Sequence, residues 1–303
     1  MTAMKIALRS FLLISTLVAV TGLTNAVVLA QIPAAITNDP IPDKEFPAKM
    51  EAPDILSHGS RLNAVFYLAS GGAPHPTVLL LHGFPGNEKN LDLAYTLQRA
   101  GWNVLLPHYR GSWGSGGNFS FANALEDAQA ALDFLRSPGN AAKFHVDPAR
   151  IIVIGHSMGG WIAAYTATRN ADVAGLVMMA AWNLGGVVSR PDLPERLDTF
   201  QNGSPRLAGT TPEALVAEAK AHAAEWNYVG YAPQLKTRPV FVLETNDRNI
   251  QDNQSMARAL RETGNTRVTE TALETDHTFS DHRIAMQAAI LAWLASLPVP
   301  SAR

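Results

Sequence analysis

The sequence predicts an α/β fold, built on a mostly parallel sheet with helices on both faces. Apolar runs too short for helices recur at residues 77–81, 103–106, 151–154, 174–179 and 239–243. Helical patterns lie between them, at residues 88–100, 121–136, 157–168 and 250–263. Continuous apolar strands that alternate with helices are typical of a parallel sheet buried on both faces. A length of 303 residues with 47% apolar content is enough for a large core.

Residues 1–30 predict a secretory signal peptide. Two basic residues, Lys5 and Arg9, precede a run of mostly apolar residues. Small residues then provide a cleavage site after Ala26 or after Ala30. An uncleaved membrane anchor is the alternative, but polar residues interrupt the apolar stretch early. We therefore expect an exported protein, periplasmic or secreted.

Composition restricts the partners. The net charge is -2 at pH 7, so the sequence offers no electrostatic basis for binding nucleic acid or an anionic membrane. The chain contains no cysteine, which excludes a disulfide framework. The expected partner is therefore a small-molecule ester that enters a cleft in the fold, and a peptide is the alternative.

The segments that flank the alternating core predict further elements. Residues 31–50 contain several prolines with little periodicity, which indicates an extended leader. Residues 61–68 alternate well enough for a half-buried strand, followed by a Gly-Gly-Ala-Pro turn at 71–74. Residues 267–272 predict a last strand, and residues 284–297 a C-terminal helix.

One interval breaks the alternation of strands and helices. Residues 182–235 contain no strand-like run, only prolines, glycines and a helical stretch near 212–225. Such an insertion would lie above the carboxyl edge of the sheet, where ligands bind in open α/β folds. Long loops in compact domains are usually functional. We therefore expect a small helical lid here rather than a plain surface excursion, within a folded domain of residues 51–303.

The pentapeptide Gly155-His156-Ser157-Met158-Gly159 lies between an apolar run and a helical pattern. In that context G-x-S-x-G predicts a sharp strand-to-helix turn that exposes the serine hydroxyl at the sheet edge. The two glycines remove side chains that would clash there. The helix N-terminus favours the negative charge of an oxyanion. Ser157 is therefore the expected nucleophile, while His156 is left open between substrate contact and packing.

A nucleophilic serine needs a base and a group that orients the base. Asp247 lies in the turn after the apolar run 239–243, where its carboxylate can reach the sheet edge. Glu244 and Asp252 are weaker candidates, because the first is expected in the strand and the second in the following helix. Asp247 is therefore the expected acid of the triad.

The base is expected after the last strand, and His277 lies in that loop. The order Ser157, Asp247, His277 is the order that this kind of fold requires. His282, near the start of the final helix, is the alternative base. Asp276, adjacent to His277, is expected to cap or orient the loop.

An oxyanion hole needs two convergent backbone N–H groups. One is expected from Met158, after the nucleophile, and the other from Phe84, in the turn after the strand at 77–81. His82 in the same turn is expected to be structural, holding the turn through its ring. Four aromatic residues are expected to line an apolar substrate pocket with the lid: Tyr109, Trp113, Phe119 and Trp182.

On these residues the chain resembles a serine hydrolase of the α/β-hydrolase superfamily. Within it, the chain is similar to the catalytic domain of prolyl oligopeptidases and acylaminoacyl peptidases and to related carboxylesterases. The matching stretches are 76–83, 109–112, 155–160, Asp247 and 276–279. The resemblance implies an α/β-hydrolase fold with an eight-stranded, mostly parallel sheet, no metal and no organic cofactor.

One departure from that branch bears on the substrate. Many of those peptidases place a tyrosine hydroxyl in the oxyanion hole, at the turn occupied here by residues 82–85, which contain no tyrosine. The sequence therefore predicts a carboxylesterase with a Ser-His-Asp triad and an acyl-enzyme. An aminopeptidase-like or acylpeptide hydrolase is the alternative, and a non-catalytic binding protein on the same fold is an alternative of another class. A dehalogenase is disfavoured, because its elbow carries a carboxylate.

Overall fold

The computed structural model describes residues 32–298. The predicted signal peptide and its cleavage sites lie outside the described residues and stay predictions. Between residues 32 and 298, no helix combines the length and apolar character needed to cross a membrane.

The main sheet is mostly parallel, as predicted. Within residues 32–298 it contains eight strands, in the spatial order β1 (Lys49–Glu51), β4 (Ala64–Leu68), β6 (Asn103–Pro107), β5 (His75–Leu81), β7 (Val146–His156), β8 (Gly175–Met179), β9 (Val240–Thr245) and β10 (Val268–Leu273). β1 pairs antiparallel with β4, and β4 pairs antiparallel with β6. All the other neighbours in the sheet run parallel. The predicted fold class, an α/β fold on a mostly parallel sheet of eight strands, is therefore confirmed.

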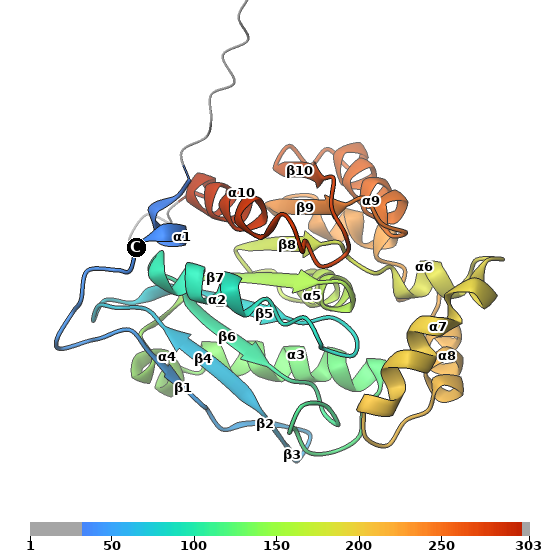
Figure 1. Cartoon of the computed structure of the whole chain (residues 1–303), viewed down its shortest axis with the longest axis horizontal. Coiled ribbons are helices and arrows are strands. Elements are labelled where there is room, and N and C mark those ends of the chain that lie inside the picture. The colour runs from blue at the N-terminus through green and yellow to red at the C-terminus, as the bar shows by residue number, and fades with distance from the viewer. Residues whose placement is uncertain (1–31, 299–303) are drawn as a thin grey trace, which may run out of the picture. The chain divides into compact units, whose positions relative to one another are not determined.

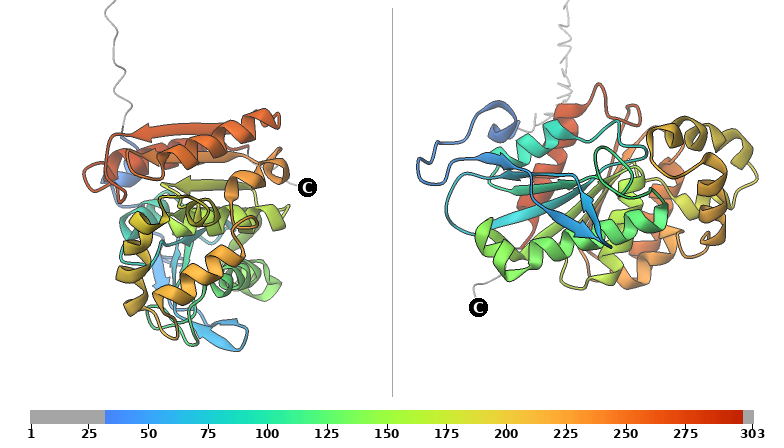
Figure 2. Two further views of the ribbon diagram at one scale, coloured as in Figure 1. Left: turned by 90° about the vertical axis from the view of Figure 1, so that its right-hand side faces the viewer. Right: turned by 90° about the horizontal axis from the view of Figure 1, so that it is seen from below.

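Helices cover both faces of this sheet (Figure 1, Figure 2). One face carries α2 (Leu91–Arg99) and α10 (Arg283–Ser296), and the other carries α3 (Phe121–Arg136), α5 (Met158–Arg169) and α9 (Ile250–Glu262). Successive residues of β5 serve the two faces in turn, because side chains alternate along a strand. Val78 and Leu80 pack with α2 and α10, whereas Leu79 and Leu81 belong to the opposite core. Burial on both faces explains why the strands read as continuous apolar runs.

The prediction of one continuous strand at residues 61–68 is wrong, because the structure divides this segment at Asn63 into two strands. β3 (Ser60–Leu62) pairs with β2 (Ile55–Ser57) in a separate two-stranded sheet, and only β4 joins the main sheet. The Asn63 N–H donates to Ser115 Oγ (2.8 Å), and Asn63 Nδ2 donates to the Trp113 carbonyl (2.7 Å). Because Asn63 bonds to the loop at residues 113–115, its backbone does not continue the strand pairing on either side.

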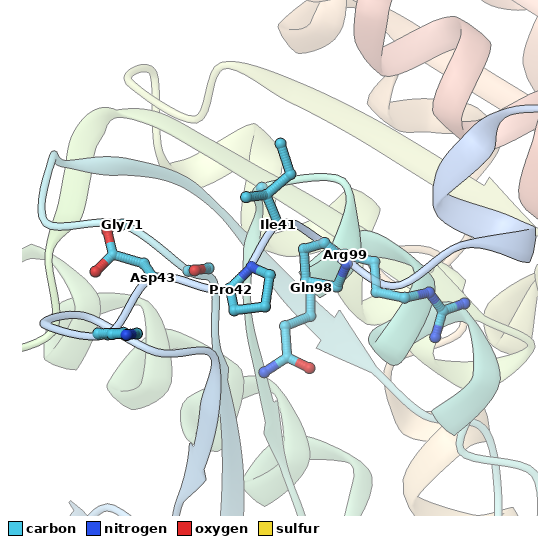
Figure 3. A pocket seen from close by; sticks show the side chains of 10 residues that line it. Ile41, Pro42, Asp43, Gly71, Gln98 and Arg99 are labelled. Carbon is cyan, nitrogen blue, oxygen red and sulfur yellow. The ribbon is translucent and has the colours of Figure 1, made fainter.

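The segment expected as an extended leader over 31–50 is attached to the folded unit. It contains the short helix α1 (Ala34–Thr37), and its end is already part of β1. Arg99 Nε donates to the Ala35 carbonyl (2.6 Å). Residues 40–44 border a pocket of about 470 Å³ together with Gln98 and Arg99, at the end of α2 (Figure 3). Backbone pairing with β4 therefore brings Lys49 and Met50, which were expected in the extended leader, into the main sheet.

The interval at 182–235 contains the helices α6 (Leu184–Val188), α7 (Leu193–Gly203) and α8 (Pro212–Ala221), with 3₁₀ turns at Ser204–Arg206 and Tyr228–Leu235. Figure 1 and Figure 2 show α6, α7 and α8 together at the end of the sheet toward which the parallel strands point. Phe200 of α7 packs against Trp182, with ring centroids 5.4 Å apart. The helices therefore lie above the carboxyl edge, and their action as a lid stays a prediction.

Candidate active site

Ser157 joins β7 to α5 at a sharp turn with φ 58° and ψ -121°. A non-glycine residue rarely adopts a positive φ, so this backbone has to be held by its surroundings. The Ser157 N–H donates to the Met179 carbonyl (2.9 Å), and the Ser157 carbonyl accepts from the Trp182 N–H (2.9 Å). A Cβ on Gly159 would lie 2.1 Å from the Leu81 carbonyl oxygen, and one on Gly155 would lie 1.9 Å from the Gly159 oxygen. The glycines therefore allow the close approach that the turn requires.

Asp247 and His277 form a hydrogen-bonded pair from two neighbouring loops. Asp247 follows β9, His277 follows β10, and His277 Nδ1–H donates to Asp247 Oδ2 in a short bond. The Asn249 N–H donates to the other carboxylate oxygen of Asp247 (2.7 Å). Burial alone would raise the pKa of Asp247, but the bond and charge of His277 and the Asn249 N–H hold it below its usual value. Because Nδ1 is engaged, the other ring nitrogen of His277 is left for proton transfer.

Ser157, Asp247 and His277 line one cavity of about 290 Å³. The structure therefore brings the three residues of the expected triad together, from sequence positions far apart. The two alternative acids do not line this cavity. Glu244 is buried within β9, and Asp252, on α9, forms an ion pair with Arg190.

The other polar residues of the base loop have separate partners. His282 precedes the first turn of α10, where Nδ1 contacts Asp281 Oδ1 at 2.9 Å. Asp276 Oδ1 accepts from the N–H groups of Ser280 (2.8 Å) and Thr278 (3.1 Å). These bonds lower the pKa of Asp276 to about 2. Asp276 thus orders the loop that carries His277.

The two expected oxyanion donors lie beside Ser157. Met158 is the first residue of α5, and the first N–H groups of a helix have no acceptor within it. Phe84 follows Gly83, whose backbone approaches the nucleophile so closely that a Cβ there would lie 2.9 Å from Ser157 Cβ. His82, in the same turn, contacts the Gly83 carbonyl through Nδ1 (2.8 Å). Burial lowers the pKa of His82 to about 4, so its ring is neutral and serves the turn.

The cavity contains only one of the four aromatic residues expected in a pocket. It is lined by Phe84, Ser157, Trp182, Thr199, Asp247, Arg248, Asn249 and His277. Tyr109 is instead fully buried and donates to the His82 carbonyl (3.0 Å). Phe119 lies behind Phe84, with ring centroids 5.8 Å apart. Trp113 donates through Nε1 to the Pro85 carbonyl (2.7 Å). These three side chains therefore contact the turn at residues 82–85 and do not line the cavity.

The sequence did not predict three polar residues that line the cavity, Thr199, Arg248 and Asn249. Arg248 and Asn249 directly follow Asp247, so adjacency to the acid was a signal that could have found them. Thr199 comes from α7, and no local pattern indicates it. Arg248 Nη2 donates to Thr199 Oγ1 (2.6 Å), which links the acid loop to α7.

Residues 78–289 match the model of the family described as "Alpha/beta hydrolase family". A relative of uncharacterized function from Mycobacterium tuberculosis is 33% identical over 141 residues, which are 46% of this chain and 48% of the relative. The chain thus spans about half the length of this curated relative.

Solved structures share the fold at low identity. An acylaminoacyl peptidase of Pyrococcus horikoshii superposes with a TM-score of 0.64 at 14% identity, over 82% of this chain and 42% of that chain. An esterase of Pyrobaculum calidifontis superposes with a TM-score of 0.62 at 22% identity, over 83% of this chain and 87% of that chain. Esterases and a peptidase are therefore both among the structural neighbours.

Proposed function

Since the chain belongs to the alpha/beta hydrolase family, we propose that it is a serine hydrolase that cleaves carboxylic esters through an acyl-enzyme. One observation carries the proposal. The hydrogen-bonded pair of Asp247 and His277 lines the same cavity as Ser157, which lies on a strained strand-to-helix turn. A nucleophile, a base and an orienter in one cavity are the parts that acyl transfer by serine requires.

In the first step His277 accepts the proton of Ser157 Oγ as that oxygen attacks the ester carbonyl carbon. Asp247 keeps the imidazole in the required tautomer and stabilises the imidazolium that forms. The backbone N–H groups of Phe84 and Met158 donate to the oxyanion of the tetrahedral intermediate. The intermediate then collapses, the carbon–oxygen bond of the leaving alkoxide breaks, and His277 protonates the alkoxide to an alcohol.

In the second step water clears the acyl-enzyme. His277 takes a proton from water as the water oxygen attacks the acyl carbon, and a second oxyanion forms in the same hole. Collapse breaks the bond to Ser157 Oγ, which recovers its proton from His277, and the carboxylic acid leaves.

The cavity favours small acyl groups. Its volume is about 290 Å³, and the rings of Phe84 and Trp182 form its apolar wall. The turn at the oxyanion hole, residues 82–85, carries no tyrosine hydroxyl, so two backbone donors form the simpler hole. Both features support a carboxylesterase for short-chain esters.

A peptide substrate is the second candidate, supported by the structural likeness to an acylaminoacyl peptidase. A panel of p-nitrophenyl esters of increasing chain length, aminoacyl p-nitroanilides and acylated peptides separates the two. We expect the highest kcat/KM on short esters, and a clear preference for acylated peptides would assign the second candidate. We also propose, from residues 1–30 alone, that the protein is exported.

The test of the serine mechanism is Ser157→Ala. We expect turnover of p-nitrophenyl acetate to fall by at least about 10³-fold, because the variant lacks the hydroxyl that forms the acyl-enzyme in this mechanism. A fluorophosphonate probe should label the wild type and not the variant. Ser255→Ala is the matched control, since Ser255 is partly exposed on α9, its hydroxyl donates to the Gln251 carbonyl (2.7 Å), and it is not among the residues that line the cavity.

Full turnover by Ser157→Ala would refute the assignment. A folded wild type that neither labels with the probe nor hydrolyses any member of the panel would instead support a non-catalytic binding protein.

A further inference from the structure

His156 links the nucleophile turn to the loop that carries the base. It is the last residue of β7, directly before Ser157, and only 2% of its surface is exposed. Its Nε2 lies 2.8 Å from the backbone carbonyl oxygen of His277. The two imidazole rings also face each other, with centroids 4.9 Å apart and planes inclined by 41°. His156 therefore touches both the ring and the backbone of the expected base.

The protonation state of His156 follows from its partners. A carbonyl oxygen only accepts, so the contact requires a proton on Nε2 of His156. Burial is the main cause that lowers the pKa of His156 to about 3, and the nearby His277 and Arg283 lower it further, against the carbonyl bond and Asp247. The ring is thus neutral at ordinary pH, with Nε2–H as the donor.

This arrangement leaves a buried polar atom without a partner. In the neutral ring Nδ1 becomes an acceptor, and within residues 32–298 it has no hydrogen-bond partner. Leaving a buried acceptor unpaired destabilises the fold, and an apolar side chain of similar size would avoid that cost. Packing alone therefore does not account for a histidine at position 156, whereas the hydrogen bond from its Nε2–H to the His277 carbonyl does.

His277 is held at two points. Asp247 engages Nδ1 of its side chain, and His156 engages its backbone carbonyl. The loop is ordered further by the Phe279 N–H, which donates to the Asp276 carbonyl (3.0 Å). An imidazole whose backbone and Nδ1 are both anchored can turn little, so its second nitrogen keeps one direction.

We propose that His156 is a positioning residue for the base: its Nε2–H holds the backbone of His277 so that the imidazole meets Asp247 and Ser157 together. The inference rests on the proposed function. His156 touches no substrate in this account and acts through His277. Because the ring is neutral, it fixes the base without repelling the imidazolium that forms during catalysis.

Two variants at this position test the proposal. His156→Leu removes the donor and keeps a bulky apolar side chain, whereas His156→Gln keeps an N–H donor at a similar reach. We expect His156→Leu to lower kcat by about 10- to 100-fold with KM changed less than about threefold, because small misplacement of a catalytic group is costly. We expect His156→Gln to recover most of the loss.

The pH profile provides a readout that packing damage would not move. In His156→Leu the contact between His277 and Asp247 is held less firmly, so the imidazolium is less stabilised. The acidic limb of the kcat/KM profile should therefore shift to lower pH, and in His156→Gln it should return toward wild type. His282→Gln is the matched control, because this histidine lies in the same segment and contacts Asp281; its kcat and profile should be unchanged.

The outcomes separate this inference from the proposed function. With an active wild type and an inactive Ser157→Ala, a His156→Leu variant with wild-type kcat and pH profile would overturn the positioning role. Equal losses in the Leu and Gln variants at equal thermal stability would also overturn it. If the Leu variant does not fold, the nitrogen NMR shifts of His156 in the wild type decide: a neutral Nε2–H tautomer down to about pH 5 supports the role, and an Nδ1–H tautomer refutes it.

Discussion

Asp247 is a largely enclosed carboxylate that depends on its partners to stay ionised. Burial alone would raise its pKa, and the bonds from His277 and the Asn249 N–H reverse that effect. An asparagine at this position would keep the shape and lose the charge that stabilises the imidazolium. It would also favour the wrong tautomer of the base.

We therefore expect Asp247→Asn to lower kcat by about 10³- to 10⁴-fold on a short-chain p-nitrophenyl ester, with little change in thermal stability. Steady-state kinetics at pH 7 and 9 give the measurement. Asp281→Asn is the matched control, because that exposed carboxylate contacts Thr275 and His282 and lies outside the cavity. Near-normal activity of Asp247→Asn together with an inactive Glu244→Gln would reassign the acid to Glu244.

Individual side chains differed in how well the sequence predicted them. His277 and Asp247 were predictable, because loops that follow neighbouring parallel strands open at the same sheet edge. Tyr109 was not, since its ring packs inward and its hydroxyl bonds the His82 carbonyl. Whether an aromatic side chain faces a cavity or a core depends on packing, and no local pattern records it.

The junction of β7 with α5 packs directly under the end of β5. A Cβ on Gly159 would lie 2.1 Å from the Leu81 carbonyl oxygen and 2.8 Å from that of His82, and backbone atoms cannot yield as a flexible side chain can. The end of β5 and the helix that follows Ser157 can therefore approach this closely because residue 159 is a glycine.

We expect Gly159→Ala to destabilise the protein by at least about 3 kcal/mol, or to prevent soluble expression. Denaturant unfolding followed by circular dichroism measures the change. Gly139→Ala in α4 (Pro138–Lys143) is the matched control, because an added Cβ there meets no atom of residues 32–298 within 4 Å apart from its chain neighbours and its own helix backbone. That variant should be neutral or more stable by about 0.5–1 kcal/mol. Equal stability of the two variants would contradict the close packing of this junction.

Glu244 and Glu270 place two carboxyl groups together where β9 pairs with β10 at the edge of the sheet. Burial, followed by the neighbouring Glu270, raises the pKa of Glu244 to about 7. A carboxyl group whose pKa is raised by folding stabilises the folded state below its ordinary pKa. That contribution is lost as the pH rises through about 7.

The free energy of unfolding should therefore include a decline on the order of 1 kcal/mol between pH 5 and pH 8. Glu244→Gln should lack this decline, so that it gains stability relative to wild type as the pH rises. The buried histidines act in the opposite direction, because their lowered pKa values favour the folded state at higher pH. They are present in both proteins, so the difference between the two denaturation series isolates Glu244. Parallel curves for the two proteins would rule out this carboxyl pair as a source of pH dependence.

The whole arrangement of strands was predictable where each element carries its own pattern. The five apolar runs became β5 to β9, and residues 121–136 form α3 as predicted. The edge of the sheet was less predictable. β1 is short and mostly exposed, and its strand pairing depends on β4, its neighbour in the sheet. The same dependence on a partner divides residues 61–68 at Asn63.

Local sequence was sufficient for the parallel α/β sheet, for the serine on a strand-to-helix turn and for the order Ser157, Asp247, His277. Periodicity, glycines and turn residues act over a few positions, so one chain is enough to reveal them. Tertiary packing alone decided which of the four expected aromatic residues lines the cavity, that Thr199 of α7 lies beside it, and that His156 contacts the His277 backbone. These features join side chains from distant elements, and their meeting depends on how the elements pack rather than on any pattern within one of them.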